Sequence, residues 1–201
     1  MKTVLGLFFC FGLATLGSSL ECEVCSELGT SCSGSIMPCE ASQDTCLIAM
    51  TEQSLVGVPM QTINKGCGSL DACRYGPKYM NFGSGKTLRS SVTCCVGDSC
   101  QTSTAQVPPA ITEPNGKQCP ACYALSSTSC PAETVDCRGP EDHCLDLAVR
   151  VIYGGNVIVN TAQKGCVSKS ACDELRRGET TFSGGSATVL KAECRPATIK
   201  A

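Results

Sequence analysis

The chain has 201 residues, 19 of them cysteine, and a formal net charge of −2. If Lys2 is removed with the N-terminal segment described below, 15 basic residues face 18 acidic ones, and the net charge becomes about −3. This balance argues against nucleic acid or an anionic membrane as the main partner, because both attract basic surfaces.

Residues 1–19 have the pattern of a secretory signal peptide. Lys2 forms a short positive region, Val4 to Leu16 form an apolar run, and Gly17-Ser18-Ser19 supplies small residues for cleavage. The apolar run is shorter than the roughly 20 residues that a helix needs to span a bilayer. We expect cleavage after Ser19 and a secreted, extracellular protein. Residues 194–201 carry neither a spanning segment nor a lipid-anchor signal, so we expect no membrane anchor.

Cysteine dominates the remaining composition. Cys10 leaves with the signal peptide, which leaves 18 cysteines, an even number and about one residue in ten. This density is typical of a disulfide scaffold in an oxidising compartment. Aromatic residues are scarce, so the apolar core is thin, and crosslinks worth about 2–4 kcal/mol each would compensate for it.

The cysteine spacings reveal an internal repeat. Ten cysteines run from Cys22 to Cys100 and eight from Cys119 to Cys194, and seven successive intervals agree to within one residue. The flanking residues agree as well, since Lys65-Gly66-Cys67 corresponds to Lys164-Gly165-Cys166. We therefore predict two homologous units. The first unit is residues 20–101, the second is residues 119–201, and the linker between them is residues 102–118.

The stretches between the cysteines predict β-hairpins. Cys46 to Met50 and Met60 to Ile63 flank a turn at Gly57-Val58-Pro59, and Val149 to Val159 reads as two β-branched runs around Gly154-Gly155-Asn156. No stretch shows sustained helical periodicity. In the linker, prolines favour an extended path, and Pro114-Asn115-Gly116 predicts a turn into the second unit. The predicted class is all-β and disulfide-rich.

Catalytic and metal-binding interpretations find little support. The Cys-x2-Cys pairs at Cys22 and Cys119 lie within longer cysteine arrays and lack the βαβ context of a redox motif, and zinc would need free thiolates. His143 is the only histidine, and we expect it in a solvated loop beside a disulfide. Gly83-Ser84-Gly85-Lys86-Thr87 lacks the spacing of a phosphate-binding loop and reads as a flexible fingertip. We expect no enzyme, no cofactor and no metal.

Protein binding remains, with two groups of candidate contact residues. The first group consists of aromatic residues expected at hairpin tips, although they could equally cover the thin core: Tyr75, Tyr79, Phe82, Tyr153 and Phe182. The second is an apolar, stiff strip in the linker, which would lose little entropy on docking but could equally be a spacer: Val107, Pro108, Pro109, Ile111 and Pro114.

Spacing alone leaves the disulfide connectivity open, because eight cysteines allow 105 pairings. The ten-cysteine pattern of the first unit resembles the three-finger, snake-toxin-like domain of the lymphocyte-antigen-6/urokinase-receptor superfamily. Two features depart from that family: Gln101 stands where asparagine is usual after the last cysteine, and the second unit lacks a fifth disulfide. The resemblance implies two tandem three-finger domains with nine disulfides: Cys22–Cys46, Cys25–Cys32, Cys39–Cys67, Cys73–Cys94, Cys95–Cys100, Cys119–Cys144, Cys122–Cys130, Cys137–Cys166 and Cys172–Cys194.

A narrower resemblance concerns the opening Cys22-Glu23-Val24-Cys25, the linker prolines and Cys119-Pro120. With two units and no lipid anchor, these features are similar to the γ-type phospholipase A2 inhibitors of reptile serum. The resemblance implies a protein that binds secreted phospholipase A2, with the linker in the contact, and that self-associates into homo- or hetero-oligomers with related subunits. The alternative is a secreted signalling or receptor-modulating protein of the same fold, pheromone-like or ligand-type.

Overall fold

The structure is a computed structural model that describes residues 20–153, 157–175, 178–182 and 185–200. The signal peptide expected over residues 1–19 and the turn expected at Gly154-Gly155-Asn156 lie outside the described residues. Both units are built from antiparallel strands and short helices, so the all-β, disulfide-rich, three-finger class is confirmed.

The first unit consists of three hairpins, β1–β2, β3–β4 and β5–β6, and two single-turn helices. Their order in the sheet is β5-β6-β3-β4-β1-β2, so the central hairpin lies between the other two. The elements are β1 (Glu21–Leu28), β2 (Ser35–Pro38), β3 (Thr45–Gln53), β4 (Met60–Gly68), α1 (Asp71–Arg74), β5 (Lys78–Asn81), β6 (Thr87–Cys95) and α2 (Ser99–Thr102).

The second unit repeats this plan with longer strands. Its elements are β7 (Pro114–Leu125), β8 (Glu133–Arg138), β9 (Glu141–Tyr153), β10 (Val157–Ser168), α3 (Lys169–Glu174), β11 (Gly178–Phe182), β12 (Gly185–Pro196) and β13 (Thr198–Ile199). The turn expected at Pro114-Asn115-Gly116 is wrong. These residues begin β7, where the register with β8 shifts between Pro114 and Gln118, and Gly116 has a φ of 79°. Glycine adopts this backbone conformation readily, so the strand bulges there instead of turning.

Nine disulfides crosslink the described residues, and they are the nine pairs that the family resemblance implies. In each unit two of them stack closely, since the sulfurs of Cys22 and Cys39 lie 3.3 Å apart and those of Cys119 and Cys137 lie 3.6 Å apart. These buried sulfurs form much of the core that the few aromatic residues do not supply.

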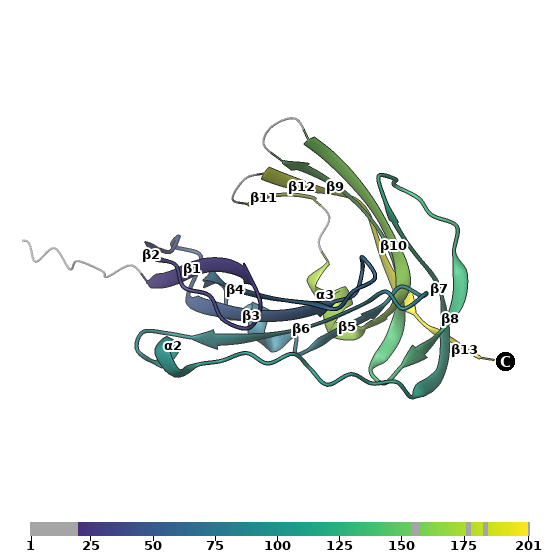
Figure 1. Ribbon diagram of the computed structural model, residues 1–201, viewed down its shortest axis with the longest axis horizontal. Helices are drawn as coiled ribbons and strands as arrows, with labels where there is room; N and C mark the ends of the chain where they lie inside the picture. The colour runs from purple at the N-terminus through teal and green to yellow at the C-terminus, as the bar shows by residue number, and fades with distance from the viewer. Residues whose placement is uncertain (1–19, 154–156, 176–177, 183–184, 201) are drawn as a thin grey trace, which may run out of the picture.

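The two units are joined into one continuous sheet. β5 of the first unit pairs with β10 of the second, with Asn81 opposite Cys166 and Met80 opposite Val167. Figure 1 shows the result: the first unit lies flat, and the long strands β9, β10 and β12 rise from its β5–β6 end and curve back over it. Helix α3 lies inside that curve.

The junction between the units has its own apolar core. Phe82 packs there against Leu145, Val167 and Ala171 of the second unit, and its ring lies 6.0 Å from that of Tyr123. Hydrogen bonds also cross the junction, among them Tyr79 N to Ser168 Oγ, Ser170 Oγ to the carbonyl of Pro77, Asn81 Nδ2 to the carbonyl of Asp136, and Ser84 Oγ to Glu133.

The expectation that Phe82 lies at an exposed, flexible fingertip is therefore wrong. Only 1% of Phe82 is exposed, because the tip of the β5–β6 hairpin is inserted into the second unit. Phe82 therefore packs between the two units and helps to hold them together.

Candidate protein-binding surfaces

The linker is attached along the face of the first unit's sheet. Three alternate side chains of β6 donate hydrogen bonds to alternate carbonyls of the linker. Thr93 Oγ1 donates to Thr104 at 3.2 Å, Ser91 Oγ to Gln106, and Arg89 Nη1 to Pro108 at 2.6 Å. Alternate residues of a strand point to the same face, so the linker lies across that face. Figure 1 shows the chain after α2 running alongside β6 toward the second unit.

Between these hydrogen bonds the linker closes the core of the first unit. Ala105 and Val107 pack against the buried cluster that contains Ile48, Met50 and Ile63. Pro108 is buried too. The linker is therefore not an exposed apolar strip over its whole length, because Pro108 is buried and Val107 is half-buried against the core.

The rest of the linker is more accessible. Pro109 is exposed, and Pro114 is exposed at the start of β7. Ile111 is half-buried, since it packs over Gly139, where an added Cβ would lie 2.8 Å from Ile111 Cδ1. Of the five linker candidates, Pro109 and Pro114 are exposed, Val107 and Ile111 are half-buried, and Pro108 is buried.

A polar row anchors the linker at its centre. Gln61 Nε2 donates to Glu52 at 2.9 Å, Arg89 forms an ion pair with the same carboxylate, and Arg89 also reaches the Pro108 carbonyl. The hydrogen bond from Gln61, helped by that from Arg89, lowers the pKa of Glu52 below its ordinary value, although burial opposes this. The carboxylate therefore stays ionised and holds the arginine against the linker.

The other aromatic candidates divide into two pairs. Tyr75 and Tyr79 are half-buried, and Tyr79 lies opposite Arg89 across β5 and β6. Tyr153 ends β9 and Phe182 ends β11, but their side chains lie outside the described part of the structure. The structure therefore leaves the role of these four aromatic residues as a prediction.

Several exposed apolar side chains of the first unit are residues that the sequence did not single out as contacts. Besides Leu70 and Val96, six of them lie on the β1–β2 hairpin and at the tip of the β3–β4 hairpin: Val24, Leu28, Ile36, Met37, Val56 and Val58. All six are aliphatic or thioether side chains, whereas the hairpin candidates chosen from the sequence are aromatic. An available signal was Ile36-Met37, an apolar pair between Ser35 and Pro38 in a segment too short to be buried on both sides.

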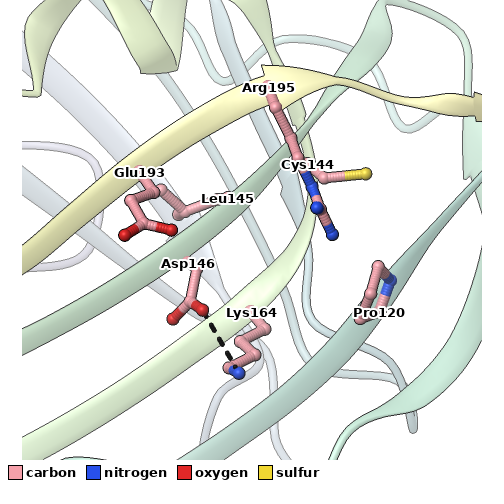
Figure 2. A pocket seen from close by; sticks show the side chains of 7 residues that line it. All are labelled: Pro120, Cys144, Leu145, Asp146, Lys164, Glu193 and Arg195. Carbon is pink, nitrogen blue, oxygen red and sulfur yellow. Dashed lines mark ion pairs between the residues drawn. The ribbon is translucent and has the colours of Figure 1, made fainter.

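The second unit has a charged hollow of about 110 Å³ on the face of β9 (Figure 2). Asp146 lines it and forms ion pairs with two lysines, Lys164 at 3.2 Å and Lys191 at 2.7 Å. Burial opposes ionisation of Asp146, but these lysines outweigh it and lower the pKa. The hollow is lined by Pro120, Cys144, Leu145, Asp146, Lys164, Glu193 and Arg195. Asp146, Lys164 and Glu193 are paired locally, which suits a solvated surface more than an apolar docking site.

His143 occupies a strand, so the expected loop position is wrong. It lies in β9 opposite Val167, and its Nδ1 is 2.6 Å from Asp142 Oδ1. Within the described residues the imidazole has no other hydrogen bond and therefore no activated hydroxyl or thiol partner. Two triplets of cysteine sulfurs, around Cys39 and Cys137, lie within 4.8 Å of one another, but all six belong to disulfides and offer no thiolate to a metal.

Among the described residues, no helix is long and apolar enough to cross a membrane.

Comparison with known proteins identifies relatives for both units. A family described as phospholipase A2 inhibitor matches residues 20–102, and one described as the u-PAR/Ly-6 domain matches residues 115–196. Phospholipase A2 inhibitor NAI from Notechis ater is 37% identical over 175 residues, which are 83% of this chain and 84% of the relative. Two phospholipase A2 inhibitor gamma subunits, from Laticauda semifasciata and Gloydius brevicaudus siniticus, are 35% and 34% identical, over 76% and 94% of this chain and 84% and 94% of theirs.

Proposed function

The chain belongs to the phospholipase A2 inhibitors, and from this membership we propose that it is a secreted protein that binds phospholipase A2 enzymes and inhibits them by protein–protein contact. The observation that carries the proposal is the 34–37% identity to proteins named as such inhibitors over most of both chains. The inhibitor acts by covering the enzyme's active-site mouth or its membrane-contacting face, and it has no catalytic activity of its own.

The proposal has further parts that accompany secretion and binding. The precursor divides into a signal peptide over residues 1–19, a three-finger domain over 20–101, a linker over 102–118 and a second domain over 119–201. The mature protein self-associates or assembles with related subunits. A signalling or receptor-modulating role on the same fold is the alternative, and the failure of the assay below would favour it.

The test is titration of the purified mature protein into assays of several secreted phospholipase A2 enzymes. The expected result is saturable inhibition with a stable complex at or below micromolar concentration. No inhibition and no complex across the enzyme groups would reject the proposal. Because Val107 packs against the core of the first unit and Pro108 is buried, the linker's part in binding is tested at the exposed prolines Pro109 and Pro114. We expect replacement of both by serine to preserve the fold, and unaltered potency would remove these two prolines from the contact.

A further inference from the structure

The junction between the units shows how one face of a three-finger unit receives another protein segment. The fingertip residue Gly83 lies against the β7–β8 hairpin, where an added Cβ would be 2.6 Å from Glu133 Oε1, 3.1 Å from Val135 and 3.4 Å from Ala121. Ser84 Oγ donates to Glu133 at 2.9 Å, and Asn81 Nδ2 reaches the carbonyl of Asp136. In the second unit, this hairpin is therefore a docking surface.

The equivalent hairpin of the first unit is vacant. Counting from the matching cysteines, Val24 corresponds to Ala121 and Met37 to Val135. Ala121 is fully buried in the junction, whereas Val24 is 42% and Met37 48% exposed, and the neighbouring Ile36 is 62% exposed. β2 also ends the sheet path, with β1 as its one partner among the described strands. An apolar hairpin at an open sheet edge is a typical place for a partner to bind.

The charge around this hairpin has one sign. From Leu20 to Asn64 the sequence contains six acidic residues and no lysine or arginine. The first basic residue, Lys65, is bound to Glu23 at 2.7 Å. The corresponding stretch of the second unit mixes both signs, with Lys117, Arg138 and Arg150 among its acids. At physiological ionic strength, charges act over about 8 Å, so a partner that approaches β1–β2 meets an acidic field.

We propose that the β1–β2 hairpin of the first unit is the surface that binds the phospholipase, through an apolar face of the enzyme that carries lysine and arginine. This inference rests on the proposed function and names its surface. An enzyme that works on phospholipid aggregates binds the lipid–water boundary with apolar side chains, and binds anionic headgroups with cations. The β1–β2 hairpin, with exposed Val24, Ile36 and Met37 among acidic residues, offers apolar contact and negative charge together, as an anionic lipid surface does. The inhibitor and such a lipid surface therefore compete for one face of the enzyme.

The test compares two double variants with the same change in charge and apolar exposure. Glu27→Lys with Ile36→Lys alters the proposed surface. Glu193→Lys with Leu125→Lys alters the second unit, where the Glu193 side chain is 59% and Leu125 53% exposed. We expect the first variant to inhibit at least about tenfold more weakly and the second to stay within about twofold of the parent. Matching circular dichroism and unfolding midpoints show that both fold.

A second measurement tests the chemistry of the partner. A catalytically inactivated basic phospholipase A2 is bound to the inhibitor and then titrated with phosphatidylglycerol or phosphatidylcholine vesicles. The anionic vesicles should release the inhibitor at lower lipid concentration, and added salt should weaken the parent complex more than that of the first variant. If the parent inhibits and the two double variants inhibit equally, the surface is wrong while the function stands. If the parent itself forms no complex, the proposed function fails.

Discussion

Two glycines in identical local sequences have opposite surroundings, and this difference makes a sharp prediction. Gly165 and Gly66 each lie between a lysine and a cysteine, and both have ordinary backbone angles. A Cβ at Gly66 would meet nothing within 4 Å. A Cβ at Gly165 would lie 2.0 Å from the carbonyl oxygen of Asn81 and 2.8 Å from its carbonyl carbon. Alanine at Gly165 must therefore push β5 away from β10.

The cost follows from what that displacement breaks. The clash is with backbone, so it cannot be relieved by a side-chain rotation, and overpacking of this kind costs about 1–3 kcal/mol. Moving β5 also loosens Phe82, whose complete loss from the core would cost about 3–5 kcal/mol. We expect Gly165→Ala to destabilise the protein by about 3 kcal/mol, or by about 6–12 °C in Tm for a chain of this size. Gly66→Ala should change stability by less than about 0.5 kcal/mol.

The assay is thermal and denaturant unfolding of the two variants and the parent with disulfides intact. Amide hydrogen exchange then reports whether the loss is local: protection should fall at Met80, Asn81, Cys166 and Val167, the residues that pair across the junction. Equal stability of the two alanine variants, with unchanged exchange at the junction, would refute the idea that a backbone contact at Gly165 holds the units together.

Other contacts make further predictions. Arg89→Ala should lower the free energy of unfolding by about 2 kcal/mol, because it leaves Glu52 and the Pro108 carbonyl without their partner. It should also speed proteolytic cleavage within residues 103–113. The control is Arg150→Ala at an exposed site, and equal cleavage of the two variants would count against the linker's attachment. Val107→Asp should lower the yield of folded protein, since it places a charge against the core that contains Ile48 and Met50, whereas Pro109→Asp at an exposed site should not. Burial raises the pKa of Glu141 to about 7 from an ordinary value of 4.5, so the contribution of Glu141 to stability is fully present below about pH 4.5 and should fall by about 1–3 kcal/mol as pH rises from 5 to 8. Glu141→Gln should flatten that dependence, because it removes the titrating group. The variant should still fold, since Gln43 accepts the equivalent backbone hydrogen bond in the first unit. An unchanged pH profile would show that Glu141 does not titrate in this range.

The candidate binding surface was the part that sequence reasoning predicted least well. Aromatic residues and prolines drew attention because they are frequent at interfaces, yet Phe82 and Pro108 are buried within the chain and Val107 is half-buried against the core. Each is apolar and follows a pattern equally suited to a core or to a surface. Exposure of Ile36 and Met37 could not be judged either, because it depends on the open edge of β2.

The sequence by itself determined the class of fold and its division into two units. Cysteine spacing, β-branched runs and turn residues are local properties of the sequence. They indicate which segments form hairpins, and this does not depend on how the two units pack together. The family resemblance then implied the nine disulfide pairs that the structure contains. Only the tertiary structure decided which copies of a repeated feature are buried. Gly66 and Gly165 share their neighbours in sequence, but of these two glycines β5 of the first unit approaches only Gly165. The reason is that the β5–β6 fingertip of the first unit packs on the second unit, whereas no fingertip packs at the equivalent place on the first unit among the described residues.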